Sequence, residues 1–259
     1  MELFIASDVG ALLSRKNGHP RQRGGRLERY RLWALNVPAT KVEIVAVGDW
    51  EIALRVPRDK NKLLEDYIEW NLEDLSPGES ERVPYWADLW PSALVLSNEI
   101  ICRRSEFQGS LVLEIGCGLG LCGMAAALAG AESVLLSDND PLAVDVARMN
   151  AENNSRILPE ATVEHRILDW RAPAAWPRDF DIVIAADVLY EPSFADDIAN
   201  LLPLVLKKGG RLLLADPFIR PHREYFLDSL RTQGKWKDIR KTTVSQQSQN
   251  IVFVTAVLG

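Results

Sequence analysis

Residues that build disulfide frameworks and metal sites are scarce in this sequence. Its 259 residues include only three cysteines, Cys102, Cys117 and Cys122, and their spacing is not paired. This argues against a disulfide framework and favours a reducing compartment, so we expect a cytoplasmic protein. The three histidines lie far apart in the sequence. Together with the unpaired cysteines they form no recognisable ligand set, so we expect no metal.

Positive charge and long apolar runs are also scarce. The formal net charge is −6, which argues against a protein that binds nucleic acid over its whole surface. Residues 111–131 form one apolar stretch with about the length of a membrane span. However, this stretch contains Glu114 and five glycines, which suit a strand, a turn and the start of a helix. No charged-then-apolar leader opens the sequence. We therefore expect a soluble protein with no membrane partner and no nucleic-acid partner.

Apolar strands and helices alternate through most of the sequence. Strand patterns are expected at residues 111–115, 133–138, 162–168, 180–187 and 211–216, and helical patterns at residues 92–104, 121–130, 141–154, 196–207 and 224–234. The sequence ends in two further strand patterns joined by a polar turn. Nearly all-apolar strands separated by helices predict a mostly parallel sheet with helices on both faces. The expected fold class is therefore α/β, a Rossmann-like doubly wound sheet.

We expect residues 1–83 to form an N-terminal extension and residues 84–259 to form the main domain. Within the extension, residues 41–57 alternate apolar and polar side chains around a turn, which predicts a β-hairpin. Residues 61–75 have helical spacing. Residues 14–31 are basic and poor in apolar residues. We interpret this basic segment as a mobile surface segment, and a contact for an acidic partner or RNA is the alternative.

A glycine-rich turn follows the first strand of the predicted sheet. Gly116, Gly118 and Gly120 separate the strand at residues 111–115 from a helix. Without a Cβ atom, a glycine lets a ligand approach the backbone closely, and the N–H groups at the helix start favour a carboxylate or phosphate. With Gly123, the last two of these glycines match the dinucleotide pattern G-x-G-x-x-G. That match alone leaves a nicotinamide-dependent oxidoreductase open.

Acidic residues at the ends of three successive strands distinguish the two cofactor classes. Glu114 would repel a pyrophosphate and attract the methionine ammonium of S-adenosylmethionine. Asp138 ends the next strand, where a carboxylate can accept hydrogen bonds from both ribose hydroxyls; both cofactor classes need this acid, so by itself it does not discriminate between them. Asp169 ends the third strand beside Trp170, where it could accept a hydrogen bond from the adenine amino group. Because ligands bind at the carboxyl ends of such strands, the sequence favours S-adenosylmethionine over a dinucleotide.

Several segments in succession resemble the motifs of seven-β-strand methyltransferases: VLEIGCGLG, LLSDND, FDIVIAADVLYEPS and LKKGGRLLLADP. More narrowly, PYWADLWPSALVL at residues 84–96, together with the segment Asp187-Val188-Leu189-Tyr190, resembles methyltransferase family 16. This group of lysine methyltransferases includes the electron-transfer flavoprotein β-subunit lysine methyltransferase. The resemblance covers about residues 40–259. It implies a seven-stranded sheet with six parallel strands and a reversed last strand, and S-adenosyl-L-methionine as the methyl donor.

The resemblance also implies roles for individual residues. The three glycines of the turn would line the methionine part of the cofactor, and Asp138 would hold its ribose. Asp169 and Trp170 would border the adenine. Trp90 would lie near the cofactor or cap the site, and the backbone of Ala186 would neighbour the sulfonium. The residues expected to bind the cofactor are then Trp90, Glu114, Gly116, Gly118, Gly120, Asp138, Asp169, Trp170 and Ala186.

Asp187 and Tyr190 would form the catalytic, substrate side of the site. Methyl transfer from a sulfonium is an in-line displacement, so catalysis consists mostly of alignment. A lysine must lose a proton before attack, since its free pKa is about 10.4. Asp187 could bind and orient the ammonium, and Tyr190 could hydrogen-bond the amine or wall the channel. Val188 and Leu189 stand where many nucleic-acid and glutamine amino methyltransferases have Pro-Pro, which argues against planar amine substrates.

We therefore predict a cytoplasmic protein-lysine N-methyltransferase whose partner is a protein with an accessible lysine. One alternative is a small-molecule N-methyltransferase, similar to nicotinamide N-methyltransferase, acting on a small-molecule amine. Another is a cofactor-binding protein without turnover. Purely structural roles remain open for single residues: Asp187 as a cap, Tyr190 as packing, and Trp86 and Trp90 as anchors of the N-terminal segment.

Overall fold

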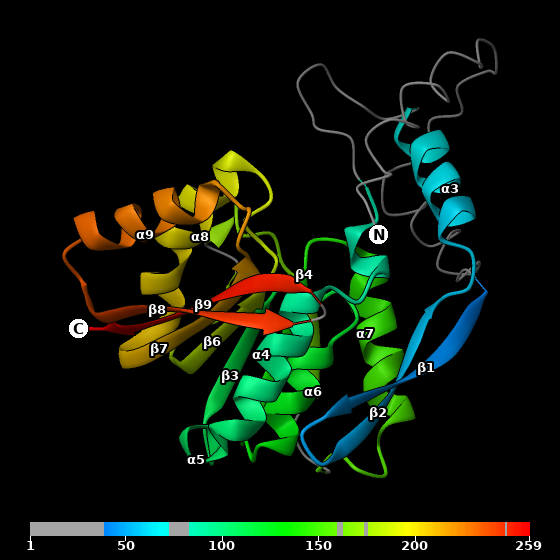
Figure 1. The fold of residues 1–259 in the computed structure, drawn as a ribbon, viewed down its shortest axis with the longest axis horizontal. Helices are drawn as coiled ribbons and strands as arrows, with labels where there is room; N and C mark the ends of the chain where they lie inside the picture. The colour runs from blue at the N-terminus through cyan, green and yellow to red at the C-terminus, as the bar shows by residue number, and fades with distance from the viewer. Residues whose placement is uncertain (1–38, 73–82, 160–162, 174–175, 247) are drawn as a thin grey trace.

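The computed structural model describes residues 39–72, 83–159, 163–173, 176–246 and 248–259 (Figure 1). The basic segment at residues 14–31 lies outside the described residues. Helix α3 (Lys60–Leu72) is the described part of the helix expected at residues 61–75. None of the described helices has the length and apolarity that a membrane span requires.

A seven-stranded sheet forms the centre of the fold, in the order β5-β4-β3-β6-β7-β9-β8. Its strands are β3 (Leu111–Ile115), β4 (Ser133–Asp138), β5 (Val163–Ile167), β6 (Phe180–Ala186), β7 (Leu206–Pro217), β8 (Trp236–Gln246) and β9 (Gln249–Leu258). The strands from β3 to β7 pair in parallel, whereas β9 runs antiparallel to both β7 and β8. Six strands therefore point one way and the last is reversed. This confirms the predicted Rossmann-like α/β class.

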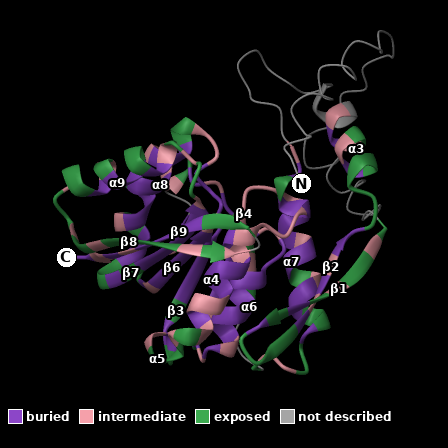
Figure 2. Cartoon of the chain, in the orientation of Figure 1, coloured by how far each residue is buried: buried purple, intermediate pink, exposed green. Residues whose placement is uncertain are grey.

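Hydrophobic clusters cover both faces of the sheet. One face carries α4 (Pro91–Cys102), α6 (Leu121–Leu128) and α7 (Pro141–Asn153), and the other carries α8 (Pro192–Val205) and α9 (His222–Thr232). Within β3, Val112 belongs to the first cluster and its neighbour Leu113 to the second. Burial on both faces explains why the strands are nearly all apolar in sequence. Figure 2 shows buried residues along the strands and exposed residues on the outer side of α9.

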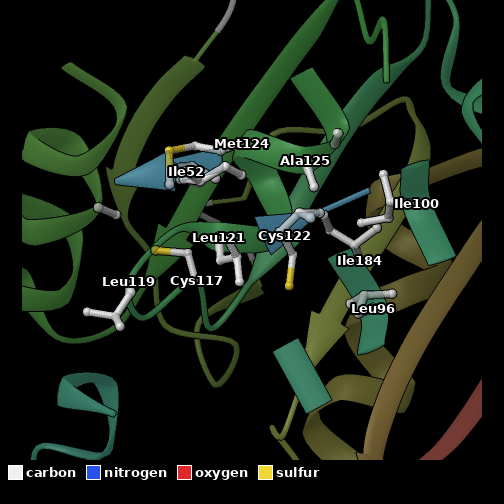
Figure 3. Packing of buried hydrophobic residues seen from close by; sticks show 14 of the residues in the cluster. Ile52, Leu96, Ile100, Cys117, Leu119, Leu121, Cys122, Met124, Ala125 and Ile184 are labelled. Carbon is white, nitrogen blue, oxygen red and sulfur yellow. The ribbon is translucent and has the colours of Figure 1, made fainter. Parts of the chain in front are cut away.

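The predicted N-terminal hairpin, β1 (Thr40–Val47) and β2 (Trp50–Pro57), packs against α7 (Figure 1). Ile52 of β2 belongs to the same cluster as the side chains of α6 (Figure 3). Asn150 of α7 accepts a hydrogen bond from the Arg55 backbone N–H at 2.6 Å. Asn154, one turn further on, accepts from the Ala53 N–H at 2.9 Å. The hairpin and the sheet thus share one core, while the domain boundary at residue 83 stays a prediction.

Predicted and observed bounds mostly differ by one or two residues, and α8 differs more. The sequence pattern placed its start at residue 196, but the helix begins at Pro192, because proline suits the first turn, where its missing N–H is not needed. β7 begins at Leu206 rather than at residue 211, and its pairing with β6 contains a register shift. Two short helices were not predicted: α5 (Arg104–Phe107) and the 3-10 helix η2 (Tyr85–Ala87).

Candidate active site

The glycine-rich turn connects β3 to α6, as predicted. Gly116, Gly118 and Gly120 all have positive φ angles, a conformation that favours glycine. Space is also restricted at Gly116, where a Cβ atom would lie 2.8 Å from a Val188 methyl carbon and 3.7 Å from the Trp170 ring. The turn therefore lies beside residues that follow β6 and β5, at the carboxyl ends of the strands.

Asp138 ends β4 beside this turn. Its Oδ2 accepts a hydrogen bond from the Gly118 N–H at 3.1 Å, and its Oδ1 accepts one from the Asp140 N–H at 3.0 Å. Burial raises the pKa of Asp138 to about 7, although these N–H donors oppose the shift. Asp140 caps α7 by accepting a hydrogen bond from the Leu142 N–H, a position at which aspartate is favoured. The structure thus brings Asp138 and the glycine turn together.

Glu114 lies buried against the first turn of α6. Its Oε2 accepts a hydrogen bond from the Gly123 N–H at 2.8 Å. A Cβ atom at Gly123 would lie 2.7 Å from this oxygen and 2.0 Å from Leu136, so helix and strand approach too closely for a larger residue. Burial raises the pKa of Glu114 to about 8, because the effect of burial is larger than the opposing effect of the hydrogen bonds with Gly123 and the Cys122 thiol. The carboxyl group therefore supports the turn, and its contact with a methionine ammonium stays a prediction.

Asp169 and Trp170 follow β5, at the same edge. The Trp170 ring is buried and packs edge-on against Phe194 of α8, with 4.8 Å between ring centroids. Its Nε1 is buried without a hydrogen-bond partner among the described residues. The Asp169 carboxylate binds the Arg171 guanidinium, with Nη2 at 2.6 Å from Oδ2. The backbone N–H of Arg171 also donates to Asp169 Oδ1 at 2.9 Å, and a contact of Asp169 with an adenine amino group stays a prediction.

Asp187 follows β6 directly and has a φ of +57°, a left-handed conformation that aspartate tolerates better than most residues. Its carboxylate is 4% exposed, and Oδ1 accepts from Nη2 of Arg220 at 2.8 Å. Oδ2 faces the Ser92 hydroxyl at 3.4 Å. Burial raises the pKa of Asp187, although Arg220 and Ser92 oppose the shift. The cap position of α8 is Glu191, so Asp187 does not cap this helix, and the alternative that it caps the turn before the helix stays open.

Aromatic rings form a continuous row along this edge. The Tyr190 ring lies 5.0 Å from the ring centroids of both Tyr85 and Phe194. Tyr85 in turn lies 6.3 Å from Trp90, whose indole N–H donates to the Tyr85 carbonyl at 2.8 Å. With the contact of Phe194 to Trp170, these rings make up what we call the aromatic row. Burial raises the pKa of Tyr190, so its hydroxyl stays protonated at neutral pH.

Trp86 connects α3 with the loop that follows β4. Its indole N–H donates to the Tyr67 hydroxyl at 2.8 Å, and this hydroxyl donates to Asp140 Oδ2 at 2.7 Å. A Cβ atom at Gly118 would lie 3.6 Å from the Trp86 backbone. Trp86 therefore anchors α3, as the packing interpretation expects, while Trp90 belongs to the aromatic row.

Comparison with known proteins assigns the chain to a family. Residues 74–233, more than half of the chain, match the family described as lysine methyltransferase. The chain belongs to this lysine methyltransferase family. The family match and the geometry agree, because the matched range contains the glycine turn, Asp138 and Asp187.

Individual relatives of this lysine methyltransferase family member match over shorter stretches. The electron transfer flavoprotein beta subunit lysine methyltransferase of Xenopus laevis is 31% identical over 135 residues, 52% of this chain and 52% of that protein. The chain thus spans about half the length of this relative. A histone-arginine methyltransferase of Homo sapiens is 31% identical over 145 residues, 55% of this chain and 75% of that protein.

A solved structure shares the fold of this lysine methyltransferase family member. It is the crystal structure of magnesium protoporphyrin IX methyltransferase from Synechocystis PCC 6803 with bound SAM. The TM-score is 0.53 at 21% sequence identity, and the match covers 78% of this chain and 98% of that chain. At this identity the likeness concerns the fold alone.

Two partners of Asp187 in this lysine methyltransferase family member were not predicted from the sequence. Arg220 lies in the connection between β7 and α9, 33 residues after Asp187, and no local motif links the two. Ser92 lies 95 residues before Asp187, at the start of α4. One signal was available: β7 neighbours β6 in a parallel sheet, so the residues after their carboxyl ends meet at one edge.

Proposed function

We propose that this chain is an S-adenosyl-L-methionine-dependent methyltransferase whose acceptor is a lysine side chain of a protein. One observation carries the proposal: the glycine turn, Asp138 and Asp187 lie at the carboxyl ends of three adjacent strands, β3, β4 and β6. This is the edge at which open α/β sheets bind ligands. At this edge a ligand can approach the backbone of the glycine turn closely, the Asp138 carboxyl group can bind a ribose, and the Asp187 carboxyl group can bind an amine.

The residues of this edge fit a positively charged nucleoside. S-adenosyl-L-methionine supplies a methyl group on a sulfonium. Asp138 would accept hydrogen bonds from the ribose hydroxyls, Gly116 would border the methionine, and Trp170 with Asp169 would border the adenine. Gly123 completes the dinucleotide pattern, but the packing of Glu114 and a leucine side chain against it already explains why this position is glycine. The pattern therefore gives no support to a pyrophosphate.

Asp187 and Tyr190 are the proposed catalytic residues of the acceptor side. The only described hydrogen bond to Oδ2 of Asp187 is the long 3.4 Å contact with Ser92, so Oδ2 can accept an N–H of the acceptor amine. Tyr190 is held between two rings of the aromatic row, which fixes the wall of the acceptor side. These contacts align the amine with the methyl group, and alignment supplies most of the catalysis in a displacement of this kind.

Several observations support a protein lysine as the acceptor. The matched family is described as lysine methyltransferase, and a relative is named for the lysine methylation of an electron transfer flavoprotein subunit. A small-molecule amine is the alternative acceptor. The cysteines Cys102, Cys117 and Cys122 are free, which supports the cytoplasm as the compartment.

Radiolabelled methyl transfer into a lysate of the native host tests this proposal. We expect labelled protein bands with the wild type and at least about tenfold weaker bands with Asp187→Asn, because the amide has one acceptor oxygen instead of two, and Arg220 already donates to one oxygen of this side chain. The matched control is Asp228→Asn, which removes an exposed carboxylate paired with Arg231 and should label like the wild type. S-adenosylhomocysteine should raise the melting temperature of all three proteins.

The other outcomes separate the alternatives. Label confined to small molecules would indicate a small-molecule amine as acceptor. Amino-acid analysis of a labelled band that yields methylarginine would replace lysine by arginine. Stabilisation by S-adenosylhomocysteine without any label would indicate a cofactor-binding protein without turnover.

A further inference from the structure

Asp187 is already paired with a positive charge inside the protein. Its carboxylate, 4% exposed, binds the guanidinium of Arg220, whose side chain is 28% exposed. The bond uses Oδ1 at 2.8 Å and leaves Oδ2 with the long contact to the Ser92 hydroxyl. Ser92 is buried and uncharged. On the acceptor side, one oxygen of the Asp187 carboxylate therefore pairs with a guanidinium, and the other oxygen can accept a further hydrogen bond.

A second acid–guanidinium pair lies behind the first. Asp216, at the end of β7, is fully buried, and Arg223 of α9 is 4% exposed. The two side chains are 3.7 Å apart at their nearest polar atoms, and the Arg223 guanidinium also donates to the Pro217 carbonyl at 2.7 Å. With Asp187 and Arg220, the group contains two acids and two guanidiniums. We call these four residues the charge cluster; its formal charge is zero when both acids are ionised.

The net charge beside a bound amine influences the protonation state in which the amine binds. A buried carboxylate without a partner would raise the pKa of a neighbouring lysine and keep it as the ammonium. An ammonium has no lone pair and cannot attack the methyl carbon. A guanidinium on the same carboxylate cancels this effect, and desolvation then favours the neutral amine.

We propose that Arg220 is a positioning residue that neutralises Asp187, so that the acceptor lysine binds as the neutral amine and donates an N–H to Oδ2. This inference rests on the proposed function and adds a role for a residue outside the recognised motifs. In the transfer, the amine lone pair forms the N–C bond while the C–S bonding pair moves to sulfur. The proton that the ammonium loses before attack passes to water, and the methylated nitrogen carries the positive charge after transfer.

Other titratable groups around the acceptor side do not reverse this balance. Tyr85 and Tyr190 have raised pKa values because both are desolvated, so they remain neutral. Glu191 acts on both tyrosines as a negative charge, and Asp138 and Asp140 act on Tyr190. These acids are the same in the wild type and in a variant of Arg220, so their effect cancels when the two are compared. The pKa of Asp216 is raised to about 7, because burial and the charge of Asp187 outweigh the two guanidiniums. Below that pH the charge cluster gains a net positive charge, which disfavours an ammonium further.

The pH dependence of Arg220→Gln separates this role from a structural one. The measurement is the initial rate of methyl transfer into native-host lysate protein at saturating S-adenosylmethionine, from pH 6.5 to pH 9.5, expressed as the ratio of variant to wild type. Loss of the guanidinium should raise the pKa of the bound amine by about one unit. We therefore expect a ratio of about one tenth at pH 7 that rises to within about twofold of unity at pH 9.5.

Two further variants complete the test. Arg220→Lys keeps the charge and should recover most of the loss at pH 7. Arg231→Gln removes an exposed arginine of α9 whose partner is Asp228, and its ratio should stay near unity at every pH. S-adenosylhomocysteine binding, measured by calorimetry, should be unchanged in Arg220→Gln, because Arg220 lies on the acceptor side.

If the ratio for Arg220→Gln does not change with pH, this inference is overturned, but the proposed function is not. Failure of Arg220→Lys to recover activity overturns this inference as well, because it would assign Arg220 a role of shape rather than charge. A wild-type protein that transfers no methyl group to any lysate protein overturns the proposed function, and this inference with it.

Discussion

The affinity for the cofactor should depend on pH through Asp138. Its pKa is raised to about 7 by burial, so the carboxylate is mostly protonated at pH 6 and mostly ionised at pH 8. In the ionised form both carboxylate oxygens can accept a hydrogen bond from the ribose hydroxyls, whereas in the protonated form one oxygen carries a proton and acts as a donor. The ionised fraction rises from about one tenth to about nine tenths over this interval, so the dissociation constant should fall about tenfold, or about 1.4 kcal/mol.

Isothermal titration calorimetry with S-adenosylhomocysteine between pH 6 and pH 8 measures this dependence. Titrations at pH 7 in buffers of different ionisation enthalpy should also reveal the release of about half a proton from Asp138. Glu114, with a pKa of about 8, should add to the release in the same direction. 5′-Methylthioadenosine keeps the ribose but lacks the amino acid, so it isolates the contribution of Asp138.

Asp138→Asn is the matched control, since it keeps the size of the side chain and does not titrate. It should bind 5′-methylthioadenosine weakly and with little dependence on pH. An affinity of the wild type that weakens as the pH rises from 6 to 8 would refute the reasoning. So would an unchanged affinity of the asparagine variant at pH 8.

Three further predictions concern the surroundings of the site. The pKa of Glu114 is raised from 4.5 to about 8, so the folded protein holds this proton more tightly than the unfolded chain. The free energy of unfolding of the ligand-free protein should therefore fall as the pH rises from about 4.5 to about 8. Urea unfolding should show a smaller fall of this free energy for Glu114→Gln. Gly116→Ala should lose S-adenosylhomocysteine binding in calorimetry, whereas Gly109→Ala, which has a similar positive φ but nothing within 4 Å of the new Cβ, should retain it. Tyr67→Phe removes hydrogen bonds to two side chains and should lower the free energy of unfolding by about 1–3 kcal/mol. The control, Tyr225→Phe, removes one exposed hydrogen bond and should change the free energy of unfolding by less than about 0.5 kcal/mol. Equal losses in the two variants would contradict the anchoring role.

The fold could be predicted because its strands have distinct sequence signals. Strands buried on both faces are almost entirely apolar, and glycine or Asp-Pro marks the adjoining turns and helix starts. The acid at the end of β4 could be placed beside the glycine turn without coordinates, because parallel strands bring their carboxyl ends to one edge. Asp138 and Gly118 meet there as expected.

The contacts of Asp187 could not be predicted in the same way. Its partner Arg220 lies in a connection whose path depends on how β7 ends and α9 begins, and neither bound follows from periodicity. The aromatic row has a similar origin, since Tyr85 belongs to a 3-10 helix too short to leave a pattern in the sequence. Glu114 was correctly placed on its strand, but its hydrogen bond to Gly123 depends on how closely α6 packs against β3 and β4.

The most direct test of the donor site is a crystal structure of the chain with S-adenosylhomocysteine. We predict that the ribose hydroxyls lie within hydrogen-bond distance of the Asp138 carboxylate, and that the thioether sulfur lies between the glycine turn and Asp187. A ligand bound elsewhere, or bound at this edge with its ribose away from Asp138, would contradict the account.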